Sequence, residues 1–353
     1  MHRILRFSKI LALSVCFSIA AGCDTENVDS QVECDQPTAE LAKVDPDGGT
    51  PSAPPGLNPS PAQGKQADNP LFKDFRSADP SPFVHDGRFY IVCGEDREVT
   101  GGYDFLMHSW RLLSSDDMTN WKYHGEVLRP DQVSWMPKDR AWASDIIYRN
   151  GYFYFYISND LQVGVLRSKN VEGPYEDVLG KPLIDSKTPN HSNRDIDPHC
   201  FVDDDGQAYL FWGGDGACRY VKLNDDMISF ASDVMEVSGV SGDGYSFLEA
   251  PFVIKENGTY FIMFATQPWA SEVHYATAST INGPWAYQAR MGAATGNGTN
   301  HPGAAYFKGQ WWYTYHTEEL SGGNTSSRCV CVDKMYINGD RIAPVSYSSF
   351  WMD

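Results

Sequence analysis

A short pattern of turn residues followed by apolar residues recurs five times along the 353-residue chain. In each copy a dipeptide ending in Gly precedes a run rich in aromatic residues, as where Asn150-Gly151 precedes Tyr152–Ile157. Asn-Gly and Asp-Gly are preferred in two-residue β-hairpin turns, because both central residues need positive φ. The five glycines are Gly87, Gly151, Gly206, Gly258 and Gly309.

The spacing of these hairpins predicts the architecture. Successive glycines lie 51 to 64 residues apart, and too little chain follows the fifth for a sixth repeat. A hairpin that recurs at such intervals is typical of radial repetition, and segments of helical periodicity are scarce. The sequence therefore predicts an all-β fold, a five-bladed β-propeller, over residues 69–353.

Ionisable residues stand at the same position in four of the five repeats. Eight or nine residues before the hairpin Gly, where the incoming strand begins, stand Asp79, Asp197, Glu249 and His301. The second repeat has no ionisable residue at this position but carries Asp145 two residues later. The first strand of each propeller blade lines the central axis, so equivalent positions should converge. We therefore expect an active site at one end of the axis.

Charge and composition narrow the class of partner. The net charge of −18 argues against nucleic acid, whose phosphates need a basic footprint, and against an anionic membrane surface. A neutral polysaccharide or oligosaccharide is compatible with it. Aromatic residues make up 13% of the chain, which suits both β-strands and sugar stacking. We expect a monomer.

The N-terminal residues 1–23 resemble an export signal. A positively charged start precedes the apolar stretch Ile10–Ala21, which is too short to span a bilayer comfortably. The phrase Ala20-Ala21-Gly22-Cys23 resembles a bacterial lipobox, so we expect acylation at Cys23 and anchoring in the cell envelope; ordinary signal cleavage with secretion is the alternative. Residues 24–68, rich in Pro, Gly and Ser, predict a flexible tether.

The cysteines of the predicted domain favour buried free thiols. Five of them are too few and too scattered for a disulfide scaffold, and no second pair of zinc ligands has suitable spacing. Cys329 and Cys331 would share one face of a strand and could not pair comfortably. A bridge between Cys200 and Cys218 stays open.

Five phrases in order carry a family resemblance. From Asn69 to Val345 the chain resembles glycoside hydrolase family 43, although Ser144 stands where a Pro is usual. The matching phrases are Ala78-Asp79-Pro80-Ser81, Ala141-Trp142-Ala143-Ser144-Asp145, Ile196-Asp197-Pro198, Leu248-Glu249-Ala250-Pro251 and Asn300-His301-Pro302-Gly303.

The resemblance implies an inverting hydrolase of pentose-containing polysaccharides. Carried over by motif, Asp79 would be the general base, Glu249 the general acid, and Asp197 the residue that raises the pKa of Glu249. Such cleavage needs a carboxylic acid loaded with a proton and an ionised carboxylate that takes one from water. A neighbouring negative charge keeps the acid loaded. No cofactor is needed, although many members bind Ca²⁺ or another cation on the axis, near His301.

Substrate contacts are expected from aromatic residues beside these phrases. The candidates are Trp135, Trp142, Phe247 and Trp269, together with Arg328, for which a structural ion pair is the alternative. Arabinofuranosidase action on arabinoxylan or arabinan is the first expectation, followed by β-xylosidase and then endo-arabinanase. The rival from another class is a non-catalytic carbohydrate-binding propeller, but a pure binding protein has no need of a loaded acid and an ionised base.

Overall fold

The computed structural model describes residues 68–97, 105–137, 139–296 and 298–348. The expected signal peptide, the lipobox at Cys23 and the tether up to residue 67 lie outside the described residues and stay predictions. Among the residues that are described, no helix has the length and apolar character needed to cross a membrane.

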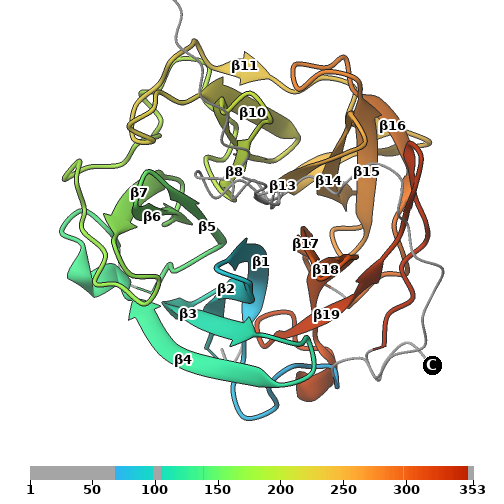
Figure 1. Ribbon diagram of the computed structural model, residues 1–353, viewed down its shortest axis with the longest axis horizontal. Coiled ribbons are helices and arrows are strands. Elements are labelled where there is room, and N and C mark those ends of the chain that lie inside the picture. The colour runs from blue at the N-terminus through green and yellow to red at the C-terminus, as the bar shows by residue number, and fades with distance from the viewer. Residues whose placement is uncertain (1–67, 98–104, 138, 297, 349–353) are drawn as a thin grey trace, which may run out of the picture. The chain divides into compact units, whose positions relative to one another are not determined.

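Figure 1 shows five antiparallel β-sheets around a central axis, which confirms the five-bladed β-propeller. The first blade has four strands and the second has three. These strands are β1 (Ala78–His85), β2 (Arg88–Asp96), β3 (Met107–Ser115) and β4 (Trp121–Leu128), then β5 (Ser144–Arg149), β6 (Tyr152–Ser158) and β7 (Val163–Ser168). A 3₁₀ helix, Pro130–Gln132, lies between these two blades in the sequence.

The remaining blades follow in chain order. The third has β8 (His199–Val202), β9 (Ala208–Gly214), β10 (Ala217–Lys222) and β11 (Met235–Glu236). The fourth has β12 (Ser241–Gly242), β13 (Tyr245–Glu256), β14 (Thr259–Gln267), β15 (Val273–Ala278) and β16 (Ala286–Arg290). The fifth has β17 (Gly303–Phe307), β18 (Gln310–Thr317) and β19 (Cys329–Met335), with a second 3₁₀ helix, Glu319–Ser321, before β19; the pair β20 (Ile337–Asn338) and β21 (Arg341–Ile342) follows.

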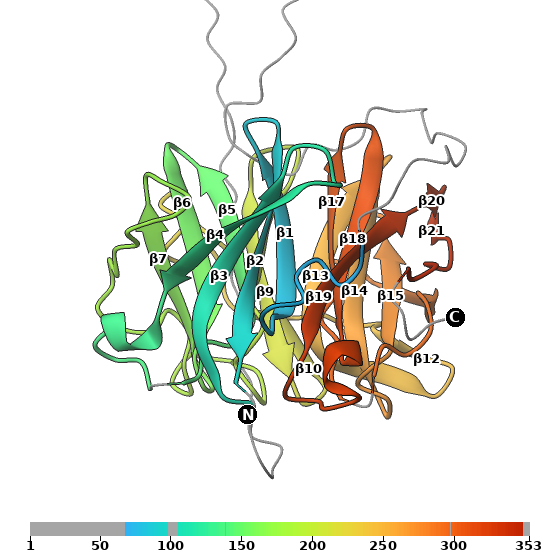
Figure 2. The same cartoon turned by 90° about the horizontal axis from the view of Figure 1, so that it is seen from below.

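The innermost strands are β1, β5, β8, β13 and β17. They form a closed ring, because β1 contacts β5 and β17, β8 contacts β5 and β13, and β13 contacts β17. Each of them begins at the same end of the axis, as the side view in Figure 2 shows for β1 and β17. The residues that begin these strands are therefore brought together from all parts of the sequence.

The hairpin turns that join the first two strands of each blade follow the sequence prediction in four blades. Both turn residues have positive φ in Asp86-Gly87, Asn150-Gly151, Asn257-Gly258 and Lys308-Gly309. The third blade differs, since only Gly206 has positive φ and five residues, 203–207, separate β8 from β9. The Gly206 N–H donates to the Asp203 carbonyl at 2.8 Å within this longer loop.

Large aromatic side chains fill the space between blades. Trp110 of β3, for example, packs edge-on against Phe155 of β6, with ring centroids 5.9 Å apart. This packing accounts for much of the aromatic content. The five cysteines of the described region are all buried and free, so Cys200 and Cys218 form no bridge.

Residues 69–77 close the ring along the outer edge of β19. The Leu71 N–H donates to the Val330 carbonyl at 2.9 Å, and the Ser77 N–H donates to the Arg328 carbonyl at 3.0 Å. The fifth blade has only three strands of its own, so this segment covers an edge that would otherwise be open.

Candidate active site

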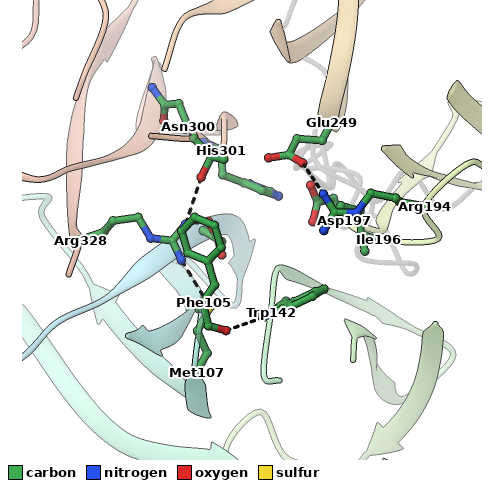
Figure 3. A pocket seen from close by; sticks show the side chains of 12 residues that line it. Phe105, Met107, Trp142, Arg194, Ile196, Asp197, Glu249, Asn300, His301 and Arg328 are labelled. Carbon is green, nitrogen blue, oxygen red and sulfur yellow. Dashed lines mark hydrogen bonds and ion pairs between the residues drawn. The ribbon is translucent and has the colours of Figure 1, made fainter. Parts of the chain in front are cut away.

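A pocket opens where the innermost strands begin, at one end of the axis (Figure 3). Its open space is about 490 Å³, including the solvent at its mouth. All four ionisable residues predicted from the repeat phase line it. The lining residues are Asp79, Phe105, Met107, Trp142, Arg194, Ile196, Asp197, Glu249, Thr299, Asn300, His301 and Arg328.

Irregular backbone at the strand starts aims the carboxyl groups. Asp79 and Asp197 have positive φ, 53° and 57°, which Asp tolerates better than most residues. The pairing of β1 with β2 is irregular between Ala78 and Ser81, and that of β13 with β14 is irregular between Glu249 and Phe252. Bulges of this kind turn a side chain away from the regular alternation of a strand.

Asp79 is held by a buried arginine. Its Oδ1 accepts a hydrogen bond from Nη1 of Arg328 at 2.7 Å, and its carboxyl group is almost fully buried. Burial raises the pKa of Asp79 to about 6, the Arg328 charge opposes that rise, and nearby Asp96 adds to it. Asp79 is therefore ionised above that pH while remaining a usable base.

Arg328 is anchored behind Asp79 by Asp96, the last residue of β2. Its Nε and Nη2 donate to the two carboxylate oxygens of Asp96 at 2.9 and 2.8 Å, a bidentate pair. Arg328 is 2% exposed. Arg328 therefore forms the structural ion pair that was the alternative for this residue. It also lines the pocket, and its contact with substrate stays a prediction.

His316 supports Asp79 from β18. The backbone N–H of Asp79 donates to Nδ1 of His316 at 3.2 Å, so Nε2 carries the proton and lies 2.6 Å from the Thr299 carbonyl. Burial, followed by the charge of Arg328, holds the pKa of His316 well below its usual value. The ring is therefore neutral and orients the backbone of the proposed base.

Glu249 is a buried carboxyl group without a close hydrogen-bonded cation. Its Oε2 lies 3.8 Å from Nη1 of Arg194. Burial raises the pKa of Glu249 to about 7, Arg194 opposes the rise, and the charge of Asp79 adds to it. A carboxyl group with this pKa keeps its proton near neutral pH, as a general acid must.

Asp197 is the third buried carboxyl group and is coupled to Glu249. Its backbone N–H donates to Ser158 Oγ at 2.6 Å, and its Oδ2 accepts from the backbone N–H of Ala250 at 3.0 Å. Burial raises the pKa of Asp197 well above its usual value, and the charges of Glu249 and Asp79 raise it further. A charge on either member of the pair disfavours a charge on the other.

His301 reaches the pocket from the start of the fifth blade, and Figure 3 shows its ring directed toward the space beside Glu249. Both ring nitrogens are buried and make no hydrogen bond to another described residue. Burial, aided by the charge of Arg328, lowers the pKa of His301 to about 3, so the imidazole is neutral.

A metal site at His301 is not supported by the ligands around it. No group of three or more His, Cys, Asp or Glu side chains that could hold a metal ion occurs among the described residues. Calcium prefers six to eight oxygen ligands, whereas His301 contributes one nitrogen. The residues do not fit an ion held by direct protein ligands, and a cation held near His301 through water molecules stays a prediction.

Of the aromatic candidates, only Trp142 lines the pocket. Trp135 packs on the core of the first two blades and donates from its indole to Asp177 at 2.9 Å. Phe247 is 1% exposed and packs against Phe264 in the core, which corrects its prediction as a sugar contact. Glu249, two residues on, would share a face with Phe247 in a regular strand. The pairing with β14 is irregular between these two residues, and Glu249 lines the pocket while Phe247 lies in the core.

Trp269 lies on the turn between β14 and β15 and is 62% exposed, outside the residues that line the pocket. Its turn is tied to the pocket wall, because the backbone N–H of Asn300 donates to the Ala270 carbonyl at 2.9 Å. Trp269 therefore stays a prediction as a contact for a longer chain of sugars.

Asp145 serves the structure of the axis. It accepts from Ser81 Oγ at 2.6 Å and from the Cys200 N–H at 2.7 Å, and its Oδ2 lies 3.1 Å from Nδ1 of His199. These contacts join the innermost strands of three blades. Asp145 lines a separate small cavity and not the pocket of the three carboxyl groups.

Asp96, His316 and Arg194 also belong to the site or support it, although no pattern in the sequence indicated them. The first two stand near the ends of β2 and β18, which are the second strands of their blades. A second strand runs antiparallel to the first, so it ends at the face where the first begins. Polar residues at the ends of the second strands are therefore a signal in the sequence for Asp96 and His316, but not for Arg194.

The described residues thus form a five-bladed propeller with three buried carboxyl groups in one axial pocket. Residues 67–342 match the profile of Glycosyl hydrolases family 43, and the chain belongs to this family. It is therefore a glycoside hydrolase.

Three relatives illustrate the similarity. A β-D-galactofuranosidase of Aspergillus niger is 30% identical, over 80% of this chain and 85% of its own length. Xylosidase/arabinosidase 43A of Humicola insolens is 29% identical, over 77% of this chain and 97% of its own length. The crystal structure of a family 43 β-xylosidase/α-arabinofuranosidase from a compost microbial metagenome, in complex with xylotriose and in a calcium-free form, aligns with a TM-score of 0.70 and 26% identity, over 80% of this chain and 98% of that one.

Proposed function

We propose that this protein is an inverting hydrolase that releases arabinofuranosyl units from plant cell-wall polysaccharide such as arabinoxylan or arabinan. The observation that carries the proposal is the meeting of three buried carboxyl groups, from three different blades, in one pocket. Release of xylosyl units is the second candidate, because relatives are named for both xylosidase and arabinosidase activity.

In the proposed mechanism Glu249 is the general acid. It donates its proton to the glycosidic oxygen as the bond to the anomeric carbon breaks, through an oxocarbenium-like transition state. The raised pKa of Glu249 keeps that proton in place until it is needed. Asp197 acts on the acid, since a charge on one of these coupled carboxyl groups disfavours a charge on the other.

Asp79 is the proposed general base. It takes a proton from a water that attacks the anomeric carbon from the face opposite the leaving group, which inverts the configuration. The hydrogen bond from Arg328 and the backbone contact to His316 hold Asp79 in one orientation. Arg328 also favours the ionised form that a base requires.

A substrate panel tests the function. Purified protein would be offered an aryl α-L-arabinofuranoside, an aryl β-D-xyloside, arabinoxylan and arabinan, and the released sugars would be identified. The product's anomeric configuration would be followed by NMR before mutarotation. We expect arabinose release with inversion, and loss of activity on every substrate in Asp79→Asn, because water attack needs a base even when the leaving group is good. Polysaccharide binding without any turnover would instead indicate a carbohydrate-binding propeller.

A further inference from the structure

Arg194 stands in the pocket on a backbone that is fixed by buried contacts. Asp195 Oδ1 accepts from the Trp212 indole at 2.9 Å and from the Ser192 N–H at 2.9 Å. Ser192 Oγ in turn accepts from the Gly214 N–H at 3.1 Å. A Cβ added to Gly214 would lie 3.0 Å from the Cβ of Arg194, so the two segments pack closely.

The guanidinium of Arg194 has no hydrogen-bond partner among the described residues. Its Nη1 lies 3.8 Å from Glu249 Oε2 and 3.9 Å from Asp215 Oδ1, both beyond hydrogen-bond length. It lies over the ring of Trp142, 5.9 Å from the centroid, a contact that favours one position of the side chain. Its donors are thus available to a ligand, and the side chain is 33% exposed.

The other pocket arginine differs in this respect. Arg328 is 2% exposed and donates to both Asp79 and Asp96. Its charge is already paired by two carboxylates. Arg194 therefore supplies the guanidinium of this pocket that is free to donate to a substrate.

The place of Arg194 beside the proposed acid determines which part of the substrate it would meet. The proton of Glu249 passes to the glycosidic oxygen, so the leaving sugar begins next to the carboxyl group of Glu249. Nη1 of Arg194 lies 3.8 Å from Oε2 of this carboxyl group, and Figure 3 shows Arg194 alongside Glu249 and Asp197. Asp79, by contrast, is proposed to take a proton from the attacking water, and Arg328 holds Asp79 in place.

We propose that Arg194 is a specificity-determining residue that donates hydrogen bonds to hydroxyl oxygens of the leaving sugar. The inference rests on the proposed function and names the class of leaving group that the same site prefers. A leaving group with hydroxyls would satisfy the open donors of Arg194, and one without hydroxyls would not. The site would accordingly favour a sugar over an alkyl or aryl leaving group.

The test compares two substrates that need the acid equally. In a methyl α-L-arabinofuranoside and in an arabinofuranosyl-xylooligosaccharide the leaving group is an alcohol that needs the proton of the acid to depart, but only the second leaving group carries further hydroxyls. In Arg194→Ala, we expect the loss in kcat/KM on the oligosaccharide to be roughly tenfold larger than on the methyl glycoside, equivalent to about 1.4 kcal/mol. Arg129→Ala, at an exposed arginine paired with Glu126 and Asp131 outside the pocket, is the control.

A pH profile and a second variant separate this role from an effect on the acid. Removing a positive charge near Glu249 raises the pKa of this acid, so the alkaline limb of Arg194→Ala should move to higher pH. Arg194→Lys keeps the positive charge but lacks the planar guanidinium with its fixed set of donors. The alkaline limb of its pH profile should therefore stay in place, while the ratio of kcat/KM on the oligosaccharide to kcat/KM on the methyl glycoside should fall.

The outcomes distinguish the two proposals. Equal losses on both substrates, or no loss on the oligosaccharide, would overturn the role of Arg194, and the melting temperature would identify a variant that fails to fold. If wild-type protein cleaves neither substrate but cleaves a xylosyl counterpart, the sugar is revised and the same comparison is made on the xyloside pair. If it cleaves no glycoside at all, the proposed function itself fails.

Discussion

At the scale of single residues, burial sets the protonation of the site more than any one neighbour does. Desolvation is the largest influence on the pKa of Asp79, Asp197 and Glu249 alike. What separates their roles is the nearest cation. Arg328 donates directly to Asp79, whereas Arg194 stays beyond hydrogen-bond length from Glu249. The same kind of group is thereby suited to the proposed base at Asp79 and to the proposed acid at Glu249.

These pKa values predict a narrow pH optimum. Asp79 must be ionised to act as a base, so activity should rise as pH increases through about 6. Glu249 must be protonated to act as an acid, so activity should fall as pH increases through about 7. A plot of kcat/KM against pH should therefore be bell-shaped with its maximum between these values.

Asp197→Asn provides the matched variant for this profile. It removes a carboxylate coupled to Glu249, so the alkaline limb should move to lower pH. A wild-type profile that is flat from pH 5 to pH 9 would contradict the assigned pair. An unmoved limb in Asp197→Asn would mean that this residue acts by positioning or by contact with substrate.

Replacing Glu249 tests the acid separately. Glu249→Gln keeps the shape of the side chain but cannot deliver a proton, so cleavage of natural polysaccharide should fall by roughly 10²–10⁴-fold. An aryl glycoside with a good leaving group needs less protonation and should lose much less. The measurement is kcat/KM on both substrates, with circular dichroism as the control for folding. Equal losses on the two would assign the proton to another residue.

At this scale the sequence predicted the residues that share one phase of the repeat. Asp79, Asp197, Glu249 and His301 all line the pocket because a propeller places equivalent positions at one end of its axis. Phe247 was misplaced because the direction of a side chain at a bulge does not follow the alternation of a regular strand. The orientation of each side chain depended on packing that no sequence pattern records.

At the scale of elements, the hairpin turns show where local sequence determines local structure. The residue before the turn glycine has positive φ in four blades. It is Asp or Asn in three of them, but in the fifth blade it is Lys308, with φ of 50°. A left-handed backbone is unfavourable for most L-residues, and Asn tolerates it better than Lys.

The turn of the fifth blade can therefore be stabilised. Lys308→Asn should raise the free energy of unfolding by about 0.5–1 kcal/mol, because the left-handed conformation becomes less costly. The reverse change, Asn257→Lys in the fourth blade, should lower it by a similar amount. Urea unfolding midpoints of the two variants and wild type would check this pair. Shifts of the same sign in both variants would show that side-chain contacts outweigh the backbone preference.

The third blade shows the limit of that local rule. Asp205-Gly206 has the preferred turn sequence, yet it lies within the five-residue connection 203–207. Asp203 there accepts from Tyr260 at 2.6 Å and pairs with Lys255 at the same distance, so contacts with the neighbouring blade accompany the longer loop. The sequence of a turn could not reveal a partner some fifty residues away.

At the scale of the whole molecule, the repeat predicted the number of blades but not how the ring is closed. Closure depends on residues 69–77, which carry no hairpin pattern and take their conformation from the edge of β19. Asn69 pairs with Val332 of that strand as a backbone residue would, since its Nδ2 donates to the carbonyl at 3.0 Å and its Oδ1 accepts from the N–H at 2.9 Å.

Asn69→Ala should accordingly weaken the ring without altering the pocket chemistry. The change leaves buried N–H and C=O groups of Val332 without partners, at a cost of about 1–3 kcal/mol in the free energy of unfolding. Activity at 25 °C should change little, because Asn69 does not line the pocket. Asn170→Ala, at an exposed asparagine whose side chain makes no hydrogen bond to another described residue, is the control in urea and thermal unfolding. If both variants unfolded at the same midpoint, closure would have to rest on the backbone contacts of Leu71 and Ser77 alone, and the amide of Asn69 would contribute nothing to it.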